Sequence, residues 1–187
     1  MKLCFKLLVF FLFSSQVVFS QEKNDAAILK VILAKYYSKE KVIVKDRLQL
    51  LSFYCEKAQN NEEFFEIITK NEILKKNSAE IKKQISIKKA ENWSNDLATL
   101  FATENQYLKS KVNNCLSLEE FQKVSKRFND NNQRLLIANK PIYFEKKYCL
   151  VKITLYRNIE HNYGCFLVLE NINSKWEIKE ILNEWAT

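Results

Sequence analysis

The stretch over residues 141–187 constrains the fold more strongly than any other part of the chain. Apolar side chains alternate along residues 148–156, which predicts a strand with one face in a core. The alternating set is Cys149, Val151, Ile153 and Leu155. Residues 165–169 are apolar at almost every position, as in a central strand covered on both faces, and alternation returns over 175–179 after a polar turn. The stretch therefore predicts an antiparallel meander of at least three strands.

Two residues predict where strands of this meander begin or become irregular. Pro141 suits the first position of a strand, because proline has no backbone N–H to donate to a neighbouring strand. The alternation slips at Glu180, where two apolar residues follow in succession, and this slip predicts a bulge or a strand end. Within the last strand, Trp176 and Ile178 are expected to point inward.

Helical patterns dominate the chain before the meander. Residues 26–38 carry apolar side chains nearly all round, which is typical of a well-buried helix. Residues 42–44 are three β-branched residues in a row and favour a short strand, whereas residues 48–57 fit a continuing helix. The shortage of glycine, with one in the whole chain, also favours helices and longer loops over tight strand turns.

Three polar pairs predict where helices begin. In a capping box, a side-chain oxygen and an acid three residues later satisfy each other's free backbone N–H groups. The pairs are Asn60 with Glu63, Asn77 with Glu80, and Ser117 with Glu120. We therefore expect one α+β domain over residues 21–187. Its N-terminal helices, about residues 21–130, pack on a C-terminal antiparallel sheet of at least three strands, about residues 141–187.

Residues 1–20 have the features of a secretory signal peptide. Lys2 and Lys6 give a positive start, the apolar core over residues 7–13 is too short to span a bilayer, and Ser20 precedes the expected cleavage point. We expect the protein to be exported, to the periplasm or the outside of the cell, with no transmembrane anchor after cleavage. Removal of two lysines lowers the net charge from +8 to +6, which gives no specific nucleic-acid signal.

Four cysteines follow the signal peptide, namely Cys55, Cys115, Cys149 and Cys165. An even number in an exported chain is compatible with disulfides in three connectivities, and equally with four buried thiols acting as small apolar residues. If Tyr156 lies opposite Gly164, Cys165 faces Leu155. Cys149 is then about 20 Å away at ~3.3 Å per residue. A disulfide requires Cα atoms within roughly 7 Å, so any bond is expected to join the sheet to Cys55 or Cys115.

A polar loop is expected between the two main strands, over residues 157–163. Its candidate ligand-contacting or partner-contacting residues are Arg157, Glu160, His161 and Tyr163. Loops held by a rigid scaffold often carry binding residues. The single histidine could act as a base beside Glu160, but a surface histidine without function is the commoner case, and no nucleophile stands at a fitting spacing. We therefore expect no catalytic residue.

Lysines at 75, 82 and 89 recur every seven residues and would share one face of a single helix. A stripe formed by Lys75, Lys82 and Lys89 could bind anionic surfaces such as lipid headgroups, nucleic acid or acidic glycans. The plainer interpretation is a solvated outer face, because runs of charge are common on exposed helices. No aromatic residues alternate with these lysines, which argues against single-stranded nucleic acid.

Several kinds of chemistry are excluded by composition. One glycine allows no P-loop, no dinucleotide-binding fingerprint and no nucleophile elbow. One histidine allows no multi-histidine metal site, and the cysteines lack C-x-x-C spacing. The sequence therefore predicts no cofactor and no metal.

Most of the chain after the signal peptide resembles a group of uncharacterised exported bacterial proteins with a helical N-terminal half and a terminal strand meander. The resemblance is carried by residues 118–121, 140–142, Trp176 with Ile178, and 183–185. Members of that group usually have a glycine-rich and often cysteine-bearing loop between the two main strands. Here only Gly164 follows the loop. The group has no known activity, so the resemblance implies a fold and export but no site.

We expect a non-catalytic binding or interaction module whose partner, a protein or an anionic surface, is unknown. One alternative is a small enzyme of the nuclear-transport-factor-like type, whose strand with Trp-x-Ile is similar and whose pocket would hold acids between helices and sheet. The other alternative is a binder of anionic surfaces through the lysine stripe.

Overall fold

The computed structural model describes residues 25–41, 43–44, 47–103, 109, 112–128, 133–158 and 161–187. It has an α+β fold, as the sequence predicts. Residues 25–36 are helical, and the further helices are α2 (Glu63–Lys70), α3 (Glu72–Lys76), α4 (Ser78–Ile85), α5 (Ser94–Thr103) and α7 (Leu118–Phe128). The strands are β1 (Ile43–Val44), β2 (Arg47–Leu48), β3 (Leu50–Tyr54), β4 (Val112–Leu116), β5 (Gln133–Ala138), β6 (Ile142–Phe144), β7 (Tyr148–Asn158), β8 (His161–Ile172) and β9 (Lys175–Ala186).

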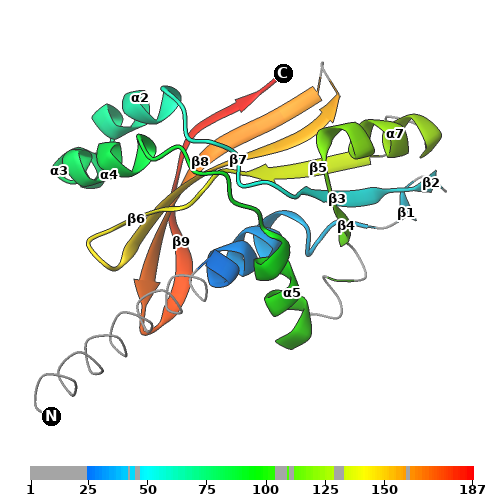
Figure 1. Cartoon of the computed structure of the whole chain (residues 1–187), viewed down its shortest axis with the longest axis horizontal. Helices are drawn as coiled ribbons and strands as arrows, with labels where there is room; N and C mark the ends of the chain where they lie inside the picture. The colour runs from blue at the N-terminus through cyan, green and yellow to red at the C-terminus, as the bar shows by residue number, and fades with distance from the viewer. Residues whose placement is uncertain are drawn as a thin grey trace, which may run out of the picture.

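Seven strands form the main sheet, in the order β4-β3-β5-β7-β8-β9, with β6 also paired to β7 (Figure 1). β1 and β2 form a separate two-stranded pair. The expected antiparallel meander is confirmed for β7, β8 and β9. The sheet as a whole is mixed, however, because β3 pairs in parallel with both β4 and β5. The prediction of a purely antiparallel sheet is therefore wrong on the β3 side.

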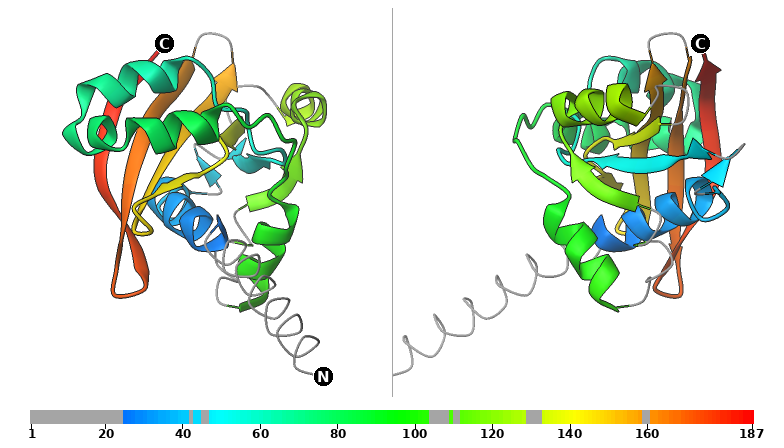
Figure 2. Two further views of the ribbon diagram at one scale, coloured as in Figure 1. Left: turned by 60° about the vertical axis from the view of Figure 1, so that its left-hand side comes forward. Right: turned by 90° about the vertical axis from the view of Figure 1, so that its right-hand side faces the viewer.

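The sheet carries a separate apolar core on each face. One face packs against the helix over residues 25–36 and α5, and Cys149, Val151 and Ile153 contribute to this core. The other face packs against α2, α3 and α4, with Phe166 and Val168 at its centre. Figures 1 and 2 show the two groups of helices on opposite sides of the long strands. The apolar run in β8 follows from this arrangement, because β8 is covered on both faces. The first residues of β7 are likewise buried on both faces, with Tyr148 and Leu150 in the second core.

The upstream predictions have mixed outcomes. The buried helix and the short strand at residues 43–44 are confirmed. The helix expected over 48–57 is wrong, because β3 occupies residues 50–54 and buries Leu51 and Phe53 completely. Tertiary pairing with β4 and β5 decides this segment, since five residues make a short strand but only a marginal helix.

A helix begins at or just after each of the three predicted polar pairs. Ser117 and Glu120 form the full capping box at the start of α7, with distances of 2.7 and 3.2 Å. A helix break at Asn77 separates α3 from α4, although the side chain of Asn77 makes no cap. The capping box at Asn60 is wrong, because α2 begins after Glu62 without a side-chain cap.

Residues other than glycine form the tight turns. Positive φ values occur at Glu145, Lys146, Asn173, Ser174 and Asn183. The turn between β8 and β9 consists of residues 173–174, so hairpins form here without the glycine that such turns usually contain. Asparagine and serine therefore adopt the left-handed backbone conformation here in place of glycine, which the shortage of glycine did not predict.

The single glycine serves close packing and not a turn. Gly164 on β8 pairs with Trp185 on β9. A Cβ atom at position 164 would lie 2.4 Å from the indole ring of Trp185, and the φ angle of Gly164 is not positive. Trp185 therefore occupies the space that any other residue at position 164 would fill.

The pairing of β7 with β8 differs from the expected register by two residues. Tyr156 lies opposite Asn162, and Cys165 lies opposite Ile153 and not Leu155. A register shift between Val168 and Leu169 in the pairing with β9 confirms the bulge expected near Glu180.

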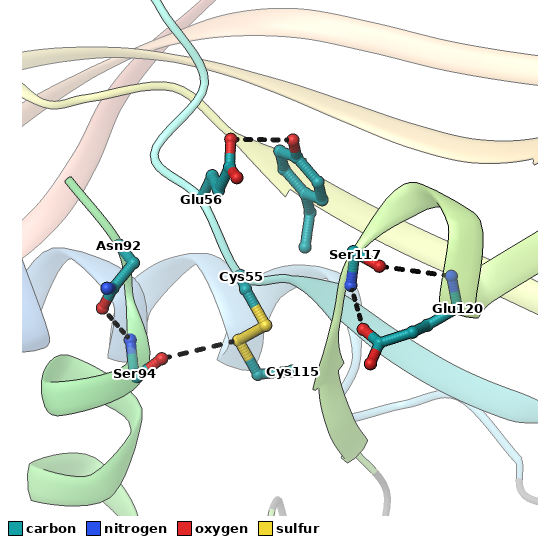
Figure 3. The surroundings of a disulfide bond; sticks show 8 residues. Cys55, Glu56, Asn92, Ser94, Cys115, Ser117 and Glu120 are labelled. Atoms are coloured by element: carbon teal, nitrogen blue, oxygen red, sulfur yellow. Dashed lines mark hydrogen bonds between the residues drawn. A yellow bond between two sulfur atoms is a disulfide. The ribbon is translucent and has the colours of Figure 1, made fainter. Parts of the chain in front are cut away.

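One disulfide joins Cys55, just after β3, to Cys115 in β4, with a Cα–Cα distance of 4.8 Å (Figure 3). Cys149 and Cys165 are buried free thiols. The expected absence of a bond between Cys149 and Cys165 is confirmed, but the expected bond from the sheet hairpin to Cys55 or Cys115 is wrong. The parallel pairing of β3 with β4, which the sequence did not reveal, brings Cys55 and Cys115 together.

Candidate functional site

A hollow of about 250 Å³ opens where β7 and β9 end and β8 begins, beside β5. We call it the strand-end hollow. It is lined by Arg134, Leu155, Tyr156, Arg157, His161, Asn162, Tyr163 and Thr187. Two arginines, a histidine and two tyrosines line the opening together with Leu155, so charged and polar side chains dominate its surface.

Arg134, from β5, is held in place by its neighbours. Its guanidinium lies 2.5 Å from a carboxylate oxygen of Glu40, which follows the helix over residues 25–36. The side-chain amide of Gln49 donates to the other oxygen of Glu40 at 3.0 Å and to the backbone oxygen of Lys41 at 3.1 Å. Glu40 therefore both neutralises the charge of Arg134 and fixes the direction of its side chain.

Arg157 stands beside Arg134 on the next strand. The antiparallel ladder between β5 and β7 ends at the pair Leu135 and Tyr156, and Arg134 and Arg157 are the next residue on each strand. Both line the hollow. Arg157 makes no ion pair within the described residues, so its charge is available to an anionic group.

Tyr163 forms the wall toward β9. Its hydroxyl donates to a carboxylate oxygen of Glu184 at 2.7 Å, and its ring lies 6.3 Å from the ring of Tyr36, measured between centroids. Burial, followed by the hydrogen bond to Glu184, raises the pKa of Tyr163 well above its usual value. The phenol is therefore neutral at physiological pH and serves as a hydrogen-bonding group.

A buried thiol lies behind this wall. The Tyr36 hydroxyl is 3.3 Å from Sγ of Cys165, and Cys165 has no exposed surface. Burial also raises the pKa of the Cys165 thiol, so the thiolate form is disfavoured. A protonated, inaccessible sulfur is a poor nucleophile, and Cys165 contributes packing to this site.

Backbone hydrogen bonds join the start of β8 to the residue after β9 at the rim of the hollow. Asn162 and Thr187 exchange backbone hydrogen bonds of 3.0 and 3.3 Å, and the Thr187 hydroxyl oxygen accepts from the Asn162 N–H at 3.2 Å. His161 is exposed at the beginning of β8. The end of β9 and the start of β8 therefore form one continuous edge of the opening.

Most of the ligand-contacting residues predicted from the sequence line this hollow, but the loop on which the prediction placed them is shorter than expected. Arg157, His161 and Tyr163 all line the hollow, while Glu160 lies outside the described residues. The expected seven-residue loop is wrong, because β7 extends to Asn158 and β8 begins at His161. Arg134 was missed because nothing in the sequence placed β5 beside β7.

The three candidate lysines do not share one helix. Lys75 is in α3, Lys82 is in α4, and Lys89 lies in the segment after α4. All three are exposed. The seven-residue spacing assumed a continuous helix, and the break at Asn77 removes that assumption.

A second hollow of about 620 Å³ lies between the start of α2 and the end of α4. It is lined by Asn60, Asn61, Glu62, Glu63, Phe65, Ile85, Ser86 and Lys88. Two acids and one lysine give it no dominant charge. None of the ligand-contacting or anion-binding residues predicted from the sequence lines this second hollow.

A buried ionic cluster occupies the interior between the helix over 25–36, α5 and the sheet. Nζ of Lys57 lies 2.5 Å from Asp25 and 3.1 Å from Asp96, and 4.6 Å from the ring centroid of Trp93. The Tyr143 hydroxyl donates to the second oxygen of Asp25 at 2.5 Å. Burial lowers the pKa of Lys57 and the two aspartates raise it, with a net increase, so the ammonium is stably charged. A charged lysine bound by two carboxylates joins elements of the fold and cannot act as a nucleophile.

The described residues contain no group of three or more His, Cys, Asp or Glu side chains placed to bind a metal ion. Within the same residues, no helix is long and apolar enough to cross a bilayer. No protein-family model, curated protein or solved structure matches the chain. The site is therefore interpreted from its own geometry.

Proposed function

We propose that the chain is an exported binding module, not an enzyme, that holds the anionic group of a small ligand in the strand-end hollow. The observation that carries the proposal is the pair of guanidinium groups from neighbouring strands, one of which, Arg157, has no anionic partner among the described residues. Guanidinium groups bind carboxylate and phosphate oxygens through paired, charge-assisted hydrogen bonds.

Binding is favoured over catalysis by the state of the neighbouring groups. Tyr163 keeps its proton and directs it to Glu184, and the thiol behind it is buried. The hollow thus offers hydrogen-bond donors, positive charge and an apolar floor. Export is supported by the N-terminal pattern of residues 1–20 and by a disulfide, which is commoner outside the cytosol.

The enzyme alternative has one observation in its favour, the buried carboxylates of Asp25 and Asp96 between helices and sheet. Lys57 lies within 3.1 Å of both, so neither carboxylate is available as a free base. Neither residue lines the two hollows described above. The alternative of an anion-binding stripe is weakened, because Lys75, Lys82 and Lys89 do not lie on one helix.

The proposal is tested by titrating the protein with inorganic phosphate or with acetate at constant ionic strength, with the chemical shifts monitored by NMR. We expect saturable shifts confined to residues around the strand-end hollow. Arg157→Gln should weaken binding about 10–100-fold, because a hydrogen bond to a charged group contributes about 1.5–3 kcal/mol. The control is Lys82→Gln, an exposed cation outside the hollow, which should leave the affinity unchanged. Equal losses in both variants, or no saturable binding, would refute the proposal.

A further inference from the structure

The helices α2 and α4 lie side by side on one face of the sheet (Figure 2). We call α2, α4 and residues 86–89 the outer helical layer. The second hollow is lined by residues from the start of α2 and from the end of α4, so the two helices run in opposite directions. Each has eight residues and is therefore about 12 Å long.

Both helices turn their apolar side toward the sheet. Phe64, Ile67 and Ile68 of α2 and Ile81 and Ile85 of α4 are buried in the core on that face. Residues on the other side of an amphipathic helix point away from the core. The charged residues of α2 and α4 therefore form the outward surface of the layer.

Charges of opposite sign lie beside each other on this surface. The start of α2 is acidic and the adjacent end of α4 is basic, while the far end of α2 carries a lysine and the start of α4 an acid. The exposed residues concerned are Glu62, Glu66, Lys70, Glu80, Lys83 and Lys88. None of the six forms an ion pair within the described residues.

The other charged residues of the same helices leave this pattern unchanged. Glu63 and Lys76 are bound in ion pairs by Lys152 and Glu145. On α3, one exposed residue of each sign remains, Glu72 and Lys75. Two further exposed lysines strengthen the basic end of α4, namely Lys82 and Lys89.

The layer is complementary to a second copy of itself. A two-fold rotation about an axis parallel to the helices places α2 of one copy against α4 of the other and keeps the direction along the axis. The acids at the start of α2 then face the lysines at the end of the second copy's α4, and Lys70 faces Glu80. Each contact occurs twice, as a two-fold interface requires.

Two exposed apolar side chains belong to the same surface. Phe65 is 38% exposed and Ile87 is 51% exposed. Phe65 lines the second hollow, and both neighbours of Ile87 in the chain also line it. The N–H of Ile87 donates to the carbonyl oxygen of Gln84, so Ile87 lies about one helical turn after Lys83. Association through this layer removes both apolar side chains from water.

We propose that the outer helical layer is the interface of a weak homodimer, in which α2 of each copy packs against α4 of the other. The interface lies outside the strand-end hollow, so the inference is independent of the anion site. Two helices about 12 Å long and about 10 Å apart offer only a few hundred Å² per copy. An interface of this size is at the weak, transient end of the range.

The experiment is sedimentation velocity of the exported protein from about 10 µM to about 1 mM at low salt, since a small interface forms only at high concentration. We expect a dimer that added salt weakens, because exposed charge pairs are screened. Glu66→Lys and Lys83→Glu should each weaken association at least tenfold, because like charges then meet at both contacts. An equimolar mixture of the two variants, and the double variant, should associate like the unaltered protein, since opposite charges meet again.

The matched controls are Glu119→Lys and Lys123→Glu on α7, both highly exposed and far from the outer helical layer (Figure 1). They should leave association unchanged, and circular dichroism checks that every variant is folded. A protein that stays monomeric at the highest concentration overturns the proposal, as does a dimer that neither charge reversal weakens. If each reversal weakens the dimer but the mixture does not restore it, the acids of α2 do not face the lysines of α4 and the proposed interface is wrong.

Discussion

Replacement of Lys57 by methionine should be among the most destabilising single changes in the protein. Methionine keeps a stem of similar length, so the main loss is the ammonium group. The side chain of Lys57 is only 7% exposed and lies 2.5 and 3.1 Å from the carboxylates of Asp25 and Asp96. Removing it leaves two buried negative charges without compensation, which costs about 3–5 kcal/mol. A folded domain is stable by only about 5–15 kcal/mol.

The assay is urea unfolding of the exported domain, supported by thermal melting. For a domain of this size a loss of 1 kcal/mol lowers Tm by roughly 2–4 °C, so Lys57→Met should lower Tm by roughly 6–20 °C. The control is Lys123→Met, which breaks an exposed ion pair with Glu119 on α7 and should cost at most about 1 kcal/mol.

Neutralising the partners tests the reason for the loss. Lys57→Met combined with Asp25→Asn and Asp96→Asn should recover much of the stability, because the uncompensated charges are then gone. The pKa of Lys57 is raised above its ordinary value of 10.5 in the folded state. Its stabilisation is therefore fully present below pH 10.5 and declines as the pH rises through the folded-state pKa. A cost below about 1 kcal/mol, or no recovery in the triple variant, would refute the reasoning.

Three further stability predictions follow from packing and covalent structure. Gly164→Ala should cost about 1–3 kcal/mol in urea unfolding, because the new methyl group would overlap the Trp185 indole; Trp185→Ala should abolish most of that cost, and an equal cost in both backgrounds would contradict the packing argument. The double change Cys55→Ser with Cys115→Ser should lower the free energy of unfolding by about 2–4 kcal/mol, since the bond closes a loop across a separation of 60 residues; the loss should match that caused by reductant in the unaltered protein. Gln133→Met should raise stability by about 1–3 kcal/mol, because both polar atoms of this fully buried amide lack a hydrogen-bond partner in the described structure; a decrease would show that the amide has a partner in solution.

The C-terminal hairpins were predictable because local patterns suffice for them. Alternation along β7 and the apolar run in β8 reflect which faces are covered, and adjacent antiparallel strands need only short connections. The capping box of Ser117 and Glu120 is local for the same reason, since three residues separate its members. Three residues of the candidate site came from this same part of the chain.

Contacts between distant segments were decided by the tertiary structure alone. The parallel pairing of β3 with β4 and β5 joins segments about 60 to 80 residues apart, and no local pattern records such pairing. That pairing brings Cys55 to Cys115 and makes the segment after residue 48 a strand. It also sets β5 between β3 and β7, so that Arg134 lines the same hollow as Arg157. The sequence by itself determined the meander and most residues at its end. The long-range sheet order determined which charged side chains lie together at that end, because strand neighbours are chosen by burial of whole faces and not by local propensity.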